Sequence, residues 1–406
     1  MLKQNKFISM IAIIGTALAI MMIMVIVLVY SIKNESIAPE VNRYRTLYLK
    51  YQRKEKTDKS NWRNSQITYD VYKNYMSGLV TPESVSAICI DKEDGHILVS
   101  GETHPQRMLF NKRLVDVNYW KIMSFSFLAG KPFTYEEFLA GMPRVVITES
   151  AAKELFGSVN LAFWKNIEID FNEYLICGVV KDVSPVFDYA YADVYIPYTA
   201  WNDYAHFGYN VLLLMREPED INTVEREIRD IERKYNLTDA EWKLSLYGPY
   251  NHRVQQINTT VEEPDVNRNN NRMISIILIL LLIPAINLSS ISYSRIKKRT
   301  DEIGIRKVFG ARKSSILMQI LCENLLVTLT GGFLGLLLSY FMLIQLKKWL
   351  LGIDASMAIP IETLVSIPVF VSIFMICLLL NMLSAVIPAY KASRMQIVDS
   401  INKKEA

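Results

Sequence analysis

The residues whose types and spacing suit a specific chemistry gather in one basic block, 295–315. The block reads RIKKRTDEIGIRKVFGARKSS and holds eight Lys/Arg against two acids, Asp301 and Glu302. Thr300 can cap a helix whose first turn carries both acids, and Gly310 is a suitable stop. The apolar residues of that helix would fill a groove on a partner: Ile303, Ile305, Val308 and Phe309. The pattern predicts a docking helix, with a basic loop that contacts lipid phosphates as the alternative.

One further pair lies within this block, and two more groups of residues follow it. Glu302 and Arg306 are four residues apart and can form a pair worth about 0.3–0.5 kcal/mol on an exposed helix. Glu323 is the one ionisable residue in the apolar run 316–346, about two turns from its start. A structural role and a role in gating are both open for it: it can reach the membrane interface, or accept a hydrogen bond from a neighbouring helix together with Gln319 or Asn324. A G-x-x-x-G spacing follows, which lets membrane helices approach closely and suits either a dimer contact or a chance occurrence of a motif that is common in spans: Gly331, Gly332 and Gly335.

Catalytic and cofactor chemistry have little support in the sequence. It contains no G-x-x-x-x-G-K-[ST] phosphate loop and no identifiable Ser/His/Asp arrangement. The four histidines are widely spaced, without a metal-binding pattern: His96, His104, His206 and His252. We therefore predict a chain that is not an enzyme and binds no cofactor or metal. Its basic residues need no nucleic-acid partner, because their placement fits membrane topology.

The elements that must position these residues are apolar runs. Four runs are long enough to cross a bilayer core of about 20 residues: 7–30, 273–293, 316–346 and 363–390. The first is longer than a signal-peptide core and lacks a clear small-x-small cleavage site, so we interpret it as an uncleaved anchor. A four-helix membrane protein is predicted.

Charge predicts the orientation of the spans. Residues 1–6, 294–315 and 391–406 hold 14 Lys/Arg and 4 Asp/Glu, whereas residues 31–272 hold 29 Lys/Arg and 34 Asp/Glu. The positive-inside rule therefore places both termini in the cytoplasm and residues 31–272 outside. The short loop 347–362 lies on the outer side as well.

Residues 31–272 are enough for one or two compact subdomains. Strand-like runs at 84–90, 144–148, 166–169 and 174–180 alternate with helical patterns at 149–156 and 218–236, which predicts an α+β domain. The part before residue 75 is polar with poor periodicity, and 253–272 resembles a linker. Cys89 and Cys177 lie in this domain. They can form a disulfide there, or each can be a buried free thiol.

The basic block, together with other segments of the chain, resembles one family. The segment KKRTDEIGIRKVFGARKSSILMQILCENLLVTLTGGFLGLLLS resembles the signature of FtsX-type ABC transporter permeases over some 45 residues. The later segment LNMLSAVIPAYKASRMQIVDSIN resembles the end of the same domain. The periplasmic core domain of MacB-type permeases resembles VVITESAAKELFGSVNLAFWKNIEIDFNEYLICGVVKDVSP followed by DVYIPYTAW. One departure is visible, because the family often has Gly where Trp164 precedes Lys165. We expect this departure to alter a turn and a local surface.

The resemblance implies a membrane protein with four transmembrane helices and a large α+β extracytoplasmic domain between helices 1 and 2. The expected order is cytoplasmic N-terminus 1–6, helix 7–30, MacB-like periplasmic core domain 31–272, helix 273–293, coupling segment 294–315, helix 316–346, periplasmic loop 347–362, helix 363–390 and cytoplasmic tail 391–406. Residues 273–400 would form the FtsX-like permease domain. The expected location is the bacterial inner membrane.

The resemblance also implies partners. A separate cytoplasmic ATPase would use ATP and Mg²⁺, because the fused ATPase of MacB is missing here, and a second permease, identical or not, would complete a dimer. The expected function is MacB-like export of a periplasmic substrate, with a periplasmic adaptor and an outer-membrane channel as further partners. Extraction of a lipid-anchored protein, regulation of a cell-wall hydrolase without transport, and sensing of small peptides are the alternatives.

Overall fold

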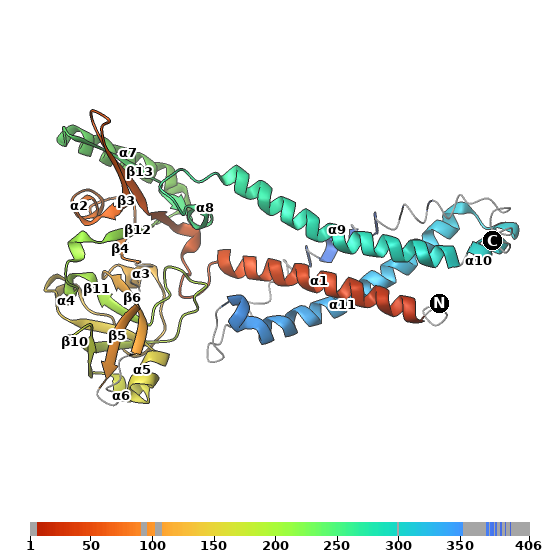
Figure 1. Ribbon diagram of the computed structural model, residues 1–406, viewed down its shortest axis with the longest axis horizontal. Helices are drawn as coiled ribbons and strands as arrows, with labels where there is room; N and C mark the ends of the chain where they lie inside the picture. The colour runs from red at the N-terminus through yellow and green to blue at the C-terminus, as the bar shows by residue number, and fades with distance from the viewer. Residues whose placement is uncertain are drawn as a thin grey trace. The chain divides into compact units, whose positions relative to one another are not determined.

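The computed structural model describes residues 6–90, 96–101, 108–298, 300–351 and part of 371–390 (Figure 1). The chain divides into two units. The helical unit contains Met1–Ser31, Asn267–Leu351 and Ala358–Ala406, and the β-rich unit contains Ile32–Val266 with Gly352–Met357.

The described part of the helical unit is built from three long helices and one short, charged helix. The long helices are α1 (Lys6–Asn34), α9 (Val266–Lys298) and α11 (Lys313–Leu351), and the short helix is α10 (Thr300–Val308). Within the described residues, 13–34 and 313–342 have the length and mean hydropathy, 2.8 and 1.9, to cross a membrane. The predicted spans 7–30, 273–293 and 316–346 fall within α1, α9 and α11. The predicted span 363–390 and the tail 391–406 lie largely or wholly outside the described residues.

The β-rich unit contains two seven-stranded sheets. The first has the order β13-β2-β3-β12-β1-β14 and is antiparallel, with β4 also paired to β12. Its strands are β1 (Thr46–Leu49), β2 (Tyr51–Lys56), β3 (Trp62–Thr68), β4 (Ser84–Ile88), β12 (Gly208–Leu214), β13 (Trp242–Tyr247) and β14 (Tyr250–Asn251). The long β12 pairs with three strands and organises this sheet.

The second sheet is mixed, with the order β7-β10-β8-β11-β6-β5-β9. The pairs β8–β10 and β6–β11 are parallel, and the others are antiparallel. Its strands are β5 (His96–Gly101), β6 (Met108–Val115), β7 (Phe127–Gly130), β8 (Arg144–Thr148), β9 (Asn166–Ile169), β10 (Asn172–Val180) and β11 (Val194–Pro197). Cys89 links the sheets, because its backbone N–H donates to the Leu114 carbonyl at 2.9 Å.

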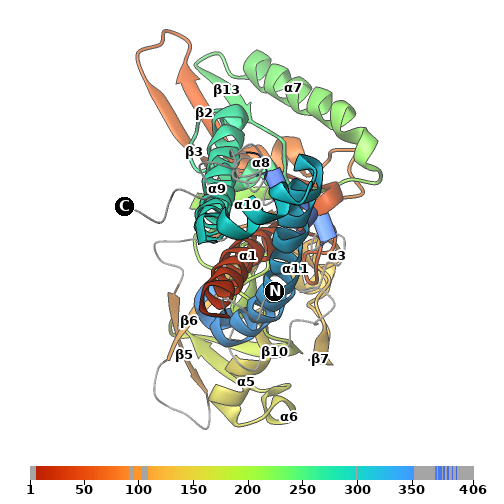
Figure 2. The ribbon, with the colours of Figure 1, turned by 90° about the vertical axis from the view of Figure 1, so that its right-hand side faces the viewer.

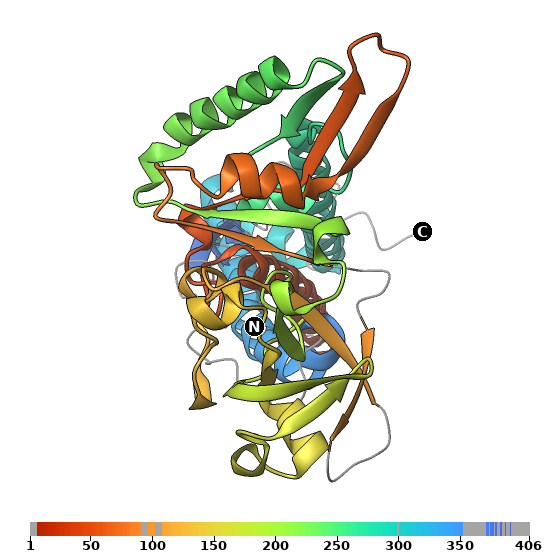
Figure 3. The ribbon, with the colours of Figure 1, turned by 90° about the vertical axis from the view of Figure 1, so that its left-hand side faces the viewer.

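Helices complete the α+β arrangement predicted from the sequence. The α-helical segments of the β-rich unit are α2 (Tyr69–Val71), α3 (Tyr119–Ile122), α4 (Tyr135–Leu139), α5 (Glu149–Phe156), α6 (Val159–Ala162), α7 (Ile221–Thr238) and α8 (His252–Ile257). Figure 3 shows α7 beside β13. The apolar stripe predicted for this helix consists of Ile221, Val224, Ile228, Ile231 and Tyr235. The last four are buried and Ile221 is half-buried. A fully buried side chain of this kind contributes about 1.5–3 kcal/mol.

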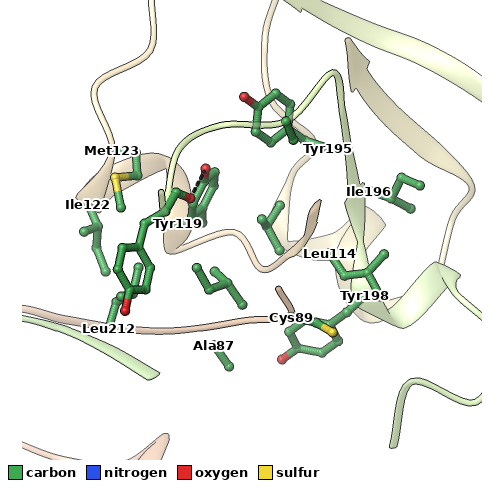
Figure 4. Packing of buried hydrophobic residues seen from close by; sticks show 14 of the residues in the cluster. Ala87, Cys89, Leu114, Tyr119, Ile122, Met123, Tyr195, Ile196, Tyr198 and Leu212 are labelled. Atoms are coloured by element: carbon green, nitrogen blue, oxygen red, sulfur yellow. Dashed lines mark hydrogen bonds between the residues drawn. The ribbon is translucent and has the colours of Figure 1, made fainter. Parts of the chain in front are cut away.

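Both sheets share one hydrophobic core (Figure 4). Tyr119 and Tyr195 are fully buried, and their ring centroids are 6.2 Å apart. Asp116 fixes the start of α3, because its Oδ1 accepts from the Tyr119 backbone N–H at 2.9 Å and from Ser86 Oγ at 2.7 Å. Cys89 and Cys177 are buried thiols, so the structure selects this alternative over a disulfide.

Three local expectations need correction. The polar stretch before residue 75 contains β1, β2 and β3, whose pairing with distant β12 and β13 overrides its weak local pattern. The predicted linker 253–272 contains most of α8, whose Asn251 cap accepts from the Val254 N–H, and the start of α9. The four residues 170–173 between two strand-like runs would suit a hairpin with a longer loop, but the strands pair up to Ile169 and Asn172. The connection is a two-residue turn, in which Asp170 and Phe171 adopt positive φ, 46° and 69°.

Candidate functional site

Helix α10 presents an apolar surface. It connects α9 to α11 within the helical unit (Figure 2). Ile305, Val308 and Phe309 are 57%, 60% and 85% exposed, whereas Ile303 is half-buried. The chain leaves the helix at Gly310, where φ is +86° and the Ala311 N–H donates to the Arg306 carbonyl at 2.9 Å. Large apolar side chains this exposed on a short, well-ended helix suit contact with a partner.

The polar residues of α10 connect it to α11. Thr300 begins the helix, and Asp301 and Glu302 lie in its first turn. Arg306 donates through Nη1 to Gln319 Oε1 at 2.5 Å, and Gln319 Nε2 donates to Glu323 Oε1 at 3.2 Å. A hydrogen-bonded chain therefore runs from α10 into α11. This geometry gives Glu323 a hydrogen-bond partner one turn before it on its own helix.

The predicted glycines face neighbouring helices of the same unit. A Cβ at Gly335 would lie 2.6 Å from the Ala17 carbonyl oxygen, and one at Gly331 would lie 2.9 Å from the Thr16 Cβ. Gly332 faces Phe374 in the same way. The G-x-x-x-G spacing thus lets α11 approach α1 closely within one chain. These contacts join α11 to the first helix.

The end of α1 is fastened by a buried ion pair in the β-rich unit. Arg43 Nε donates to Glu40 Oε2 at 2.7 Å, and both side chains are at least 98% buried. Arg43 Nη1 donates to three carbonyl oxygens, those of Ile32, Lys33 and Glu35, at 2.8–3.1 Å. Carbonyls at a helix C-terminus lack partners within the helix, so a buried guanidinium can satisfy them.

The same carboxylate reaches the loop between β10 and β11. Glu40 Oε1 accepts from the backbone N–H groups of Tyr189 and Ala190, each at 3.1 Å. The guanidinium carbon of Arg43 also lies 4.9 Å from the centroid of the Phe187 ring. Burial raises the pKa of Glu40, while Arg43 and the two N–H groups oppose that shift. One ion pair thus ties α1 to a loop some 150 residues later in the chain.

A second group of side chains fastens the same helix end. His252 Nε2 lies 3.0 Å from the Lys33 carbonyl oxygen, and Gln256 Nε2 donates to that oxygen at 2.9 Å. His252 Nδ1 lies 3.3 Å from Tyr48 Oη. Burial, aided by the positive charges of Arg43 and Lys50, lowers the pKa of His252 to about 4. His252 is therefore neutral at pH 7. We call Glu40, Arg43, His252 and Gln256 the α1 anchor.

Sequence reasoning missed the α1 anchor. Its members lie at positions 40, 43, 252 and 256, and no local spacing joins the two halves. Arg43 stands in a polar stretch without periodicity, and His252 looks like one of several scattered histidines. Co-variation between the two halves is the kind of signal that could have found them.

The sequence matches two known families. Residues 9–231 match the MacB-like periplasmic core domain, which is more than half of the chain, and residues 274–397 match the FtsX-like permease C-terminal domain. The ABC transporter permease YknZ of Bacillus subtilis is 25% identical over 71% of this chain and 68% of its own length. The macrolide export ATP-binding/permease protein MacB of Burkholderia cenocepacia is 25% identical over 79% of this chain and 44% of its own length.

Solved structures of related regions were also found. The extracellular domain of YknZ, from Gram-positive bacteria, is 16% identical and covers 49% of this chain and 99% of its own, with a TM-score of 0.37. The periplasmic region of MacB from Actinobacillus actinomycetemcomitans is 14% identical and covers 52% of this chain and 94% of its own, with a TM-score of 0.35.

Proposed function

Because the chain belongs to the FtsX/MacB-type family of ABC transporter permeases, we propose that it couples ATP hydrolysis by a separate cytoplasmic ATPase to movement of its β-rich unit. The observation that carries this proposal is the exposed apolar surface of α10, at Ile305, Val308 and Phe309. The ATPase would bind ATP and Mg²⁺, and this chain would supply the docking helix. A second permease, identical or different, would complete the dimer.

The proposed topology has four spans, with both termini in the cytoplasm of a bacterial inner membrane. The excess of Lys/Arg in 294–315 supports a cytoplasmic α10, and the acidic balance of 31–272 supports an extracytoplasmic β-rich unit. In that arrangement α10 faces the ATPase, while the α1 anchor lies on the opposite side. The motion must therefore pass along the helices.

The contacts within each unit supply a continuous route for that motion. Arg306 and Gln319 join α10 to α11. Gly331 and Gly335 bring α11 against α1. Helix α1 runs without a break from Lys6 to Asn34, where the α1 anchor holds it. Packed helices of this kind shift as rigid elements, so a displacement of α10 would reach the β-rich unit.

The proposed work is MacB-like export of a substrate from the outer side of the membrane. The described exposed side chains of α1, α9 and α11 are largely apolar, which does not favour a hydrophilic path between them. The large β-rich unit instead supports action outside the membrane, together with an adaptor and an outer-membrane channel. Crosslinks between paired β-rich units that form equally with and without ATP would contradict this mechanism.

A double substitution tests the docking. Changing Ile305 and Phe309 to Asp would place two carboxylates in the proposed contact, and we expect the chain to insert normally and lose stimulation of ATP hydrolysis in the co-purified complex. The matched control is Val80→Asp with Leu237→Asp, because these residues are 78% and 82% exposed in the β-rich unit. Stimulation that survives the α10 double substitution would contradict the proposal.

A further inference from the structure

A cavity of about 850 Å³ lies within the β-rich unit. Its walls come from the first sheet at Lys50 and Tyr51, from β6 at Lys112 and Arg113, from the β10–β11 loop at Asp188–Tyr191, and from α8 and the residues after it. A volume of this size lies within the range of pockets that bind small organic molecules. None of its lining residues has a role in the proposed docking.

The cavity wall is positively charged. Among the described residues that line it, Lys50, Lys112 and Arg113 are cations and Asp188 is the one carboxylate. Arg113 is 5% exposed and donates through Nη2 to the carbonyl oxygens of Asp188, at 2.8 Å, and Tyr191, at 2.5 Å. Lys112 Nζ lies 4.6 Å from the centroid of the Trp201 ring. Carbonyl oxygens orient Arg113 and the Trp201 ring faces Lys112, and because these groups are neutral, this part of the wall favours an anion.

The rest of the wall is rich in amide groups and aromatic rings. Asn258 is 1% exposed, and neither its Nδ2 nor its Oδ1 has a hydrogen-bond partner among the described residues. A buried amide without partners is costly, by about 1–3 kcal/mol per group. Other amides and aromatic rings share the wall: Gln66, Asn210, Tyr51, Tyr189 and Phe207. Groups that both donate and accept, beside aromatic rings, match the amides of a peptide backbone.

The cavity wall also includes residues of the β-rich unit that hold the chain next to the end of α1 and before the start of α9. Tyr189, whose N–H is bound by Glu40, lines the cavity, and so does Gln256, which holds the end of α1. Lys50 Nζ donates to the Gln255 and Asn258 carbonyl oxygens, and Tyr51 Oη donates to that of Thr259 at 3.1 Å. These last residues precede α9. A ligand in the cavity would therefore contact the segments that fasten both α1 and α9.

We propose that this cavity binds a short peptide through its free carboxylate. The carboxylate lies near Lys112 and Arg113, and the peptide amides pair with the amide side chains of the wall. A bound peptide stiffens the connections to α1 and α9. The binding itself needs no ATPase, whereas any resulting change in ATP hydrolysis rests on the proposed function.

A peptide library tests this proposal. The full chain in lipid nanodiscs is incubated with randomised N-acetylated tetrapeptides, either as free acids or as C-terminal amides, and retained peptides are identified by mass spectrometry. We expect free acids to bind about tenfold more tightly than their amides, the effect of one charge-assisted hydrogen bond. Equal retention of the two libraries, or no retention of either, overturns the proposal.

Two variants and a second anion complete the test. Lys112 is half-buried, and Lys112→Gln removes its positive charge from the cavity wall. We expect this variant to bind the retained peptides about fivefold or more weakly. Lys121→Gln, an exposed position on α3 outside the cavity, should leave binding unchanged. If Lys112→Gln binds as the native chain does, the assignment to this cavity is wrong. If glycerol phosphate binds and displaces the peptides at lower concentration, the peptide assignment is wrong. Because no step uses ATP, these outcomes are independent of the docking proposal.

Discussion

The outer face of α10 and the α1 anchor are opposites in their physical chemistry. The face of α10 is apolar and exposed, with Phe309 85% accessible. The α1 anchor is charged and buried, and Arg43 alone makes four hydrogen bonds. A surface that binds a partner must remain exposed in the single chain. A joint, meaning a contact that transmits force within the chain, must instead have its charged and polar groups paired inside the protein. Under the proposed function, the contact of α10 forms when the chain assembles with the ATPase, whereas the α1 anchor forms when the chain folds.

The largest effect on stability is expected at the α1 anchor. Arg43→Ala leaves Glu40 as a buried carboxylate without its cation and leaves three carbonyl oxygens without their donor. Removing one partner of a buried ion pair costs about 3–5 kcal/mol. Urea unfolding of the purified chain in detergent, followed by aromatic fluorescence, measures this loss. Arg233→Ala removes an exposed pair with Asp230 and should cost less than about 1 kcal/mol. Similar losses for the two variants would mean that the α1 anchor is not a joint.

The next effect depends on pH. His252 has a pKa of about 4 in the folded chain and an ordinary value of 6.5. Between these values the unfolded chain binds the proton and the folded chain does not, so stability is fully present above pH 6.5 and is lost as the pH falls towards 4. The full loss is about 3 kcal/mol, from 1.36 kcal/mol per pKa unit.

His252→Gln isolates this contribution. The variant keeps a polar side chain but removes the titrating ring, while the carboxylates elsewhere titrate in both proteins. We expect the free energy of unfolding of the native chain to fall more steeply between pH 7 and pH 4 than that of the variant. If the free energies of unfolding of the two proteins vary in parallel with pH, folding does not lower the pKa of His252.

A smaller effect is expected where α11 meets α1. Gly335→Ala would place a methyl group 2.6 Å from the Ala17 carbonyl oxygen, so the two helices must separate. Overpacking of this kind costs about 1–3 kcal/mol. Gly78→Ala is the matched control, because no atom lies within 4 Å of its added Cβ and its φ is not positive. Thermal unfolding of both variants in detergent measures the difference, and an equal shift in the two would argue against close packing at Gly335.

The same contrast explains how far the sequence alone could lead. The docking helix is local: its basic block, its apolar residues and Gly310 stand within one stretch of chain, so a helix near 300–310 could be predicted. The stripe on α7 and the stop at Gly157, with φ of +79°, are local for the same reason. The family resemblance gave the order of the domains.

Contacts between distant segments were beyond this reasoning. Strands β2 and β3 carry polar residues on both faces, and their pairing with β13 and β12 decides their conformation. The α1 anchor and the cavity bring together positions about 40, 110, 190 and 255, which no periodicity connects. Trp164 lies between these two cases. It stands where the family often has Gly, and its backbone adopts a positive φ of 63°, as a Gly would allow. The sequence alone indicated a turn at Trp164, whereas the residues that contact it could be identified only from the fold.

The smallest effect on stability is expected at Phe309, where the effect on coupling should be large. The side chain is 85% exposed, so Phe309→Asp removes little packing and should change the free energy of unfolding by less than about 0.5 kcal/mol. The same substitution should weaken association with the ATPase, because a carboxylate would then enter an apolar contact. Urea unfolding and co-purification of one variant measure both quantities. A loss of stability comparable to that of Arg43→Ala would mean that Phe309 packs within the chain, and the distinction between an assembled contact and a folded joint would fail. A stable variant that no longer retains the ATPase would place the exchangeable contact at α10 and leave the permanent one at the α1 anchor.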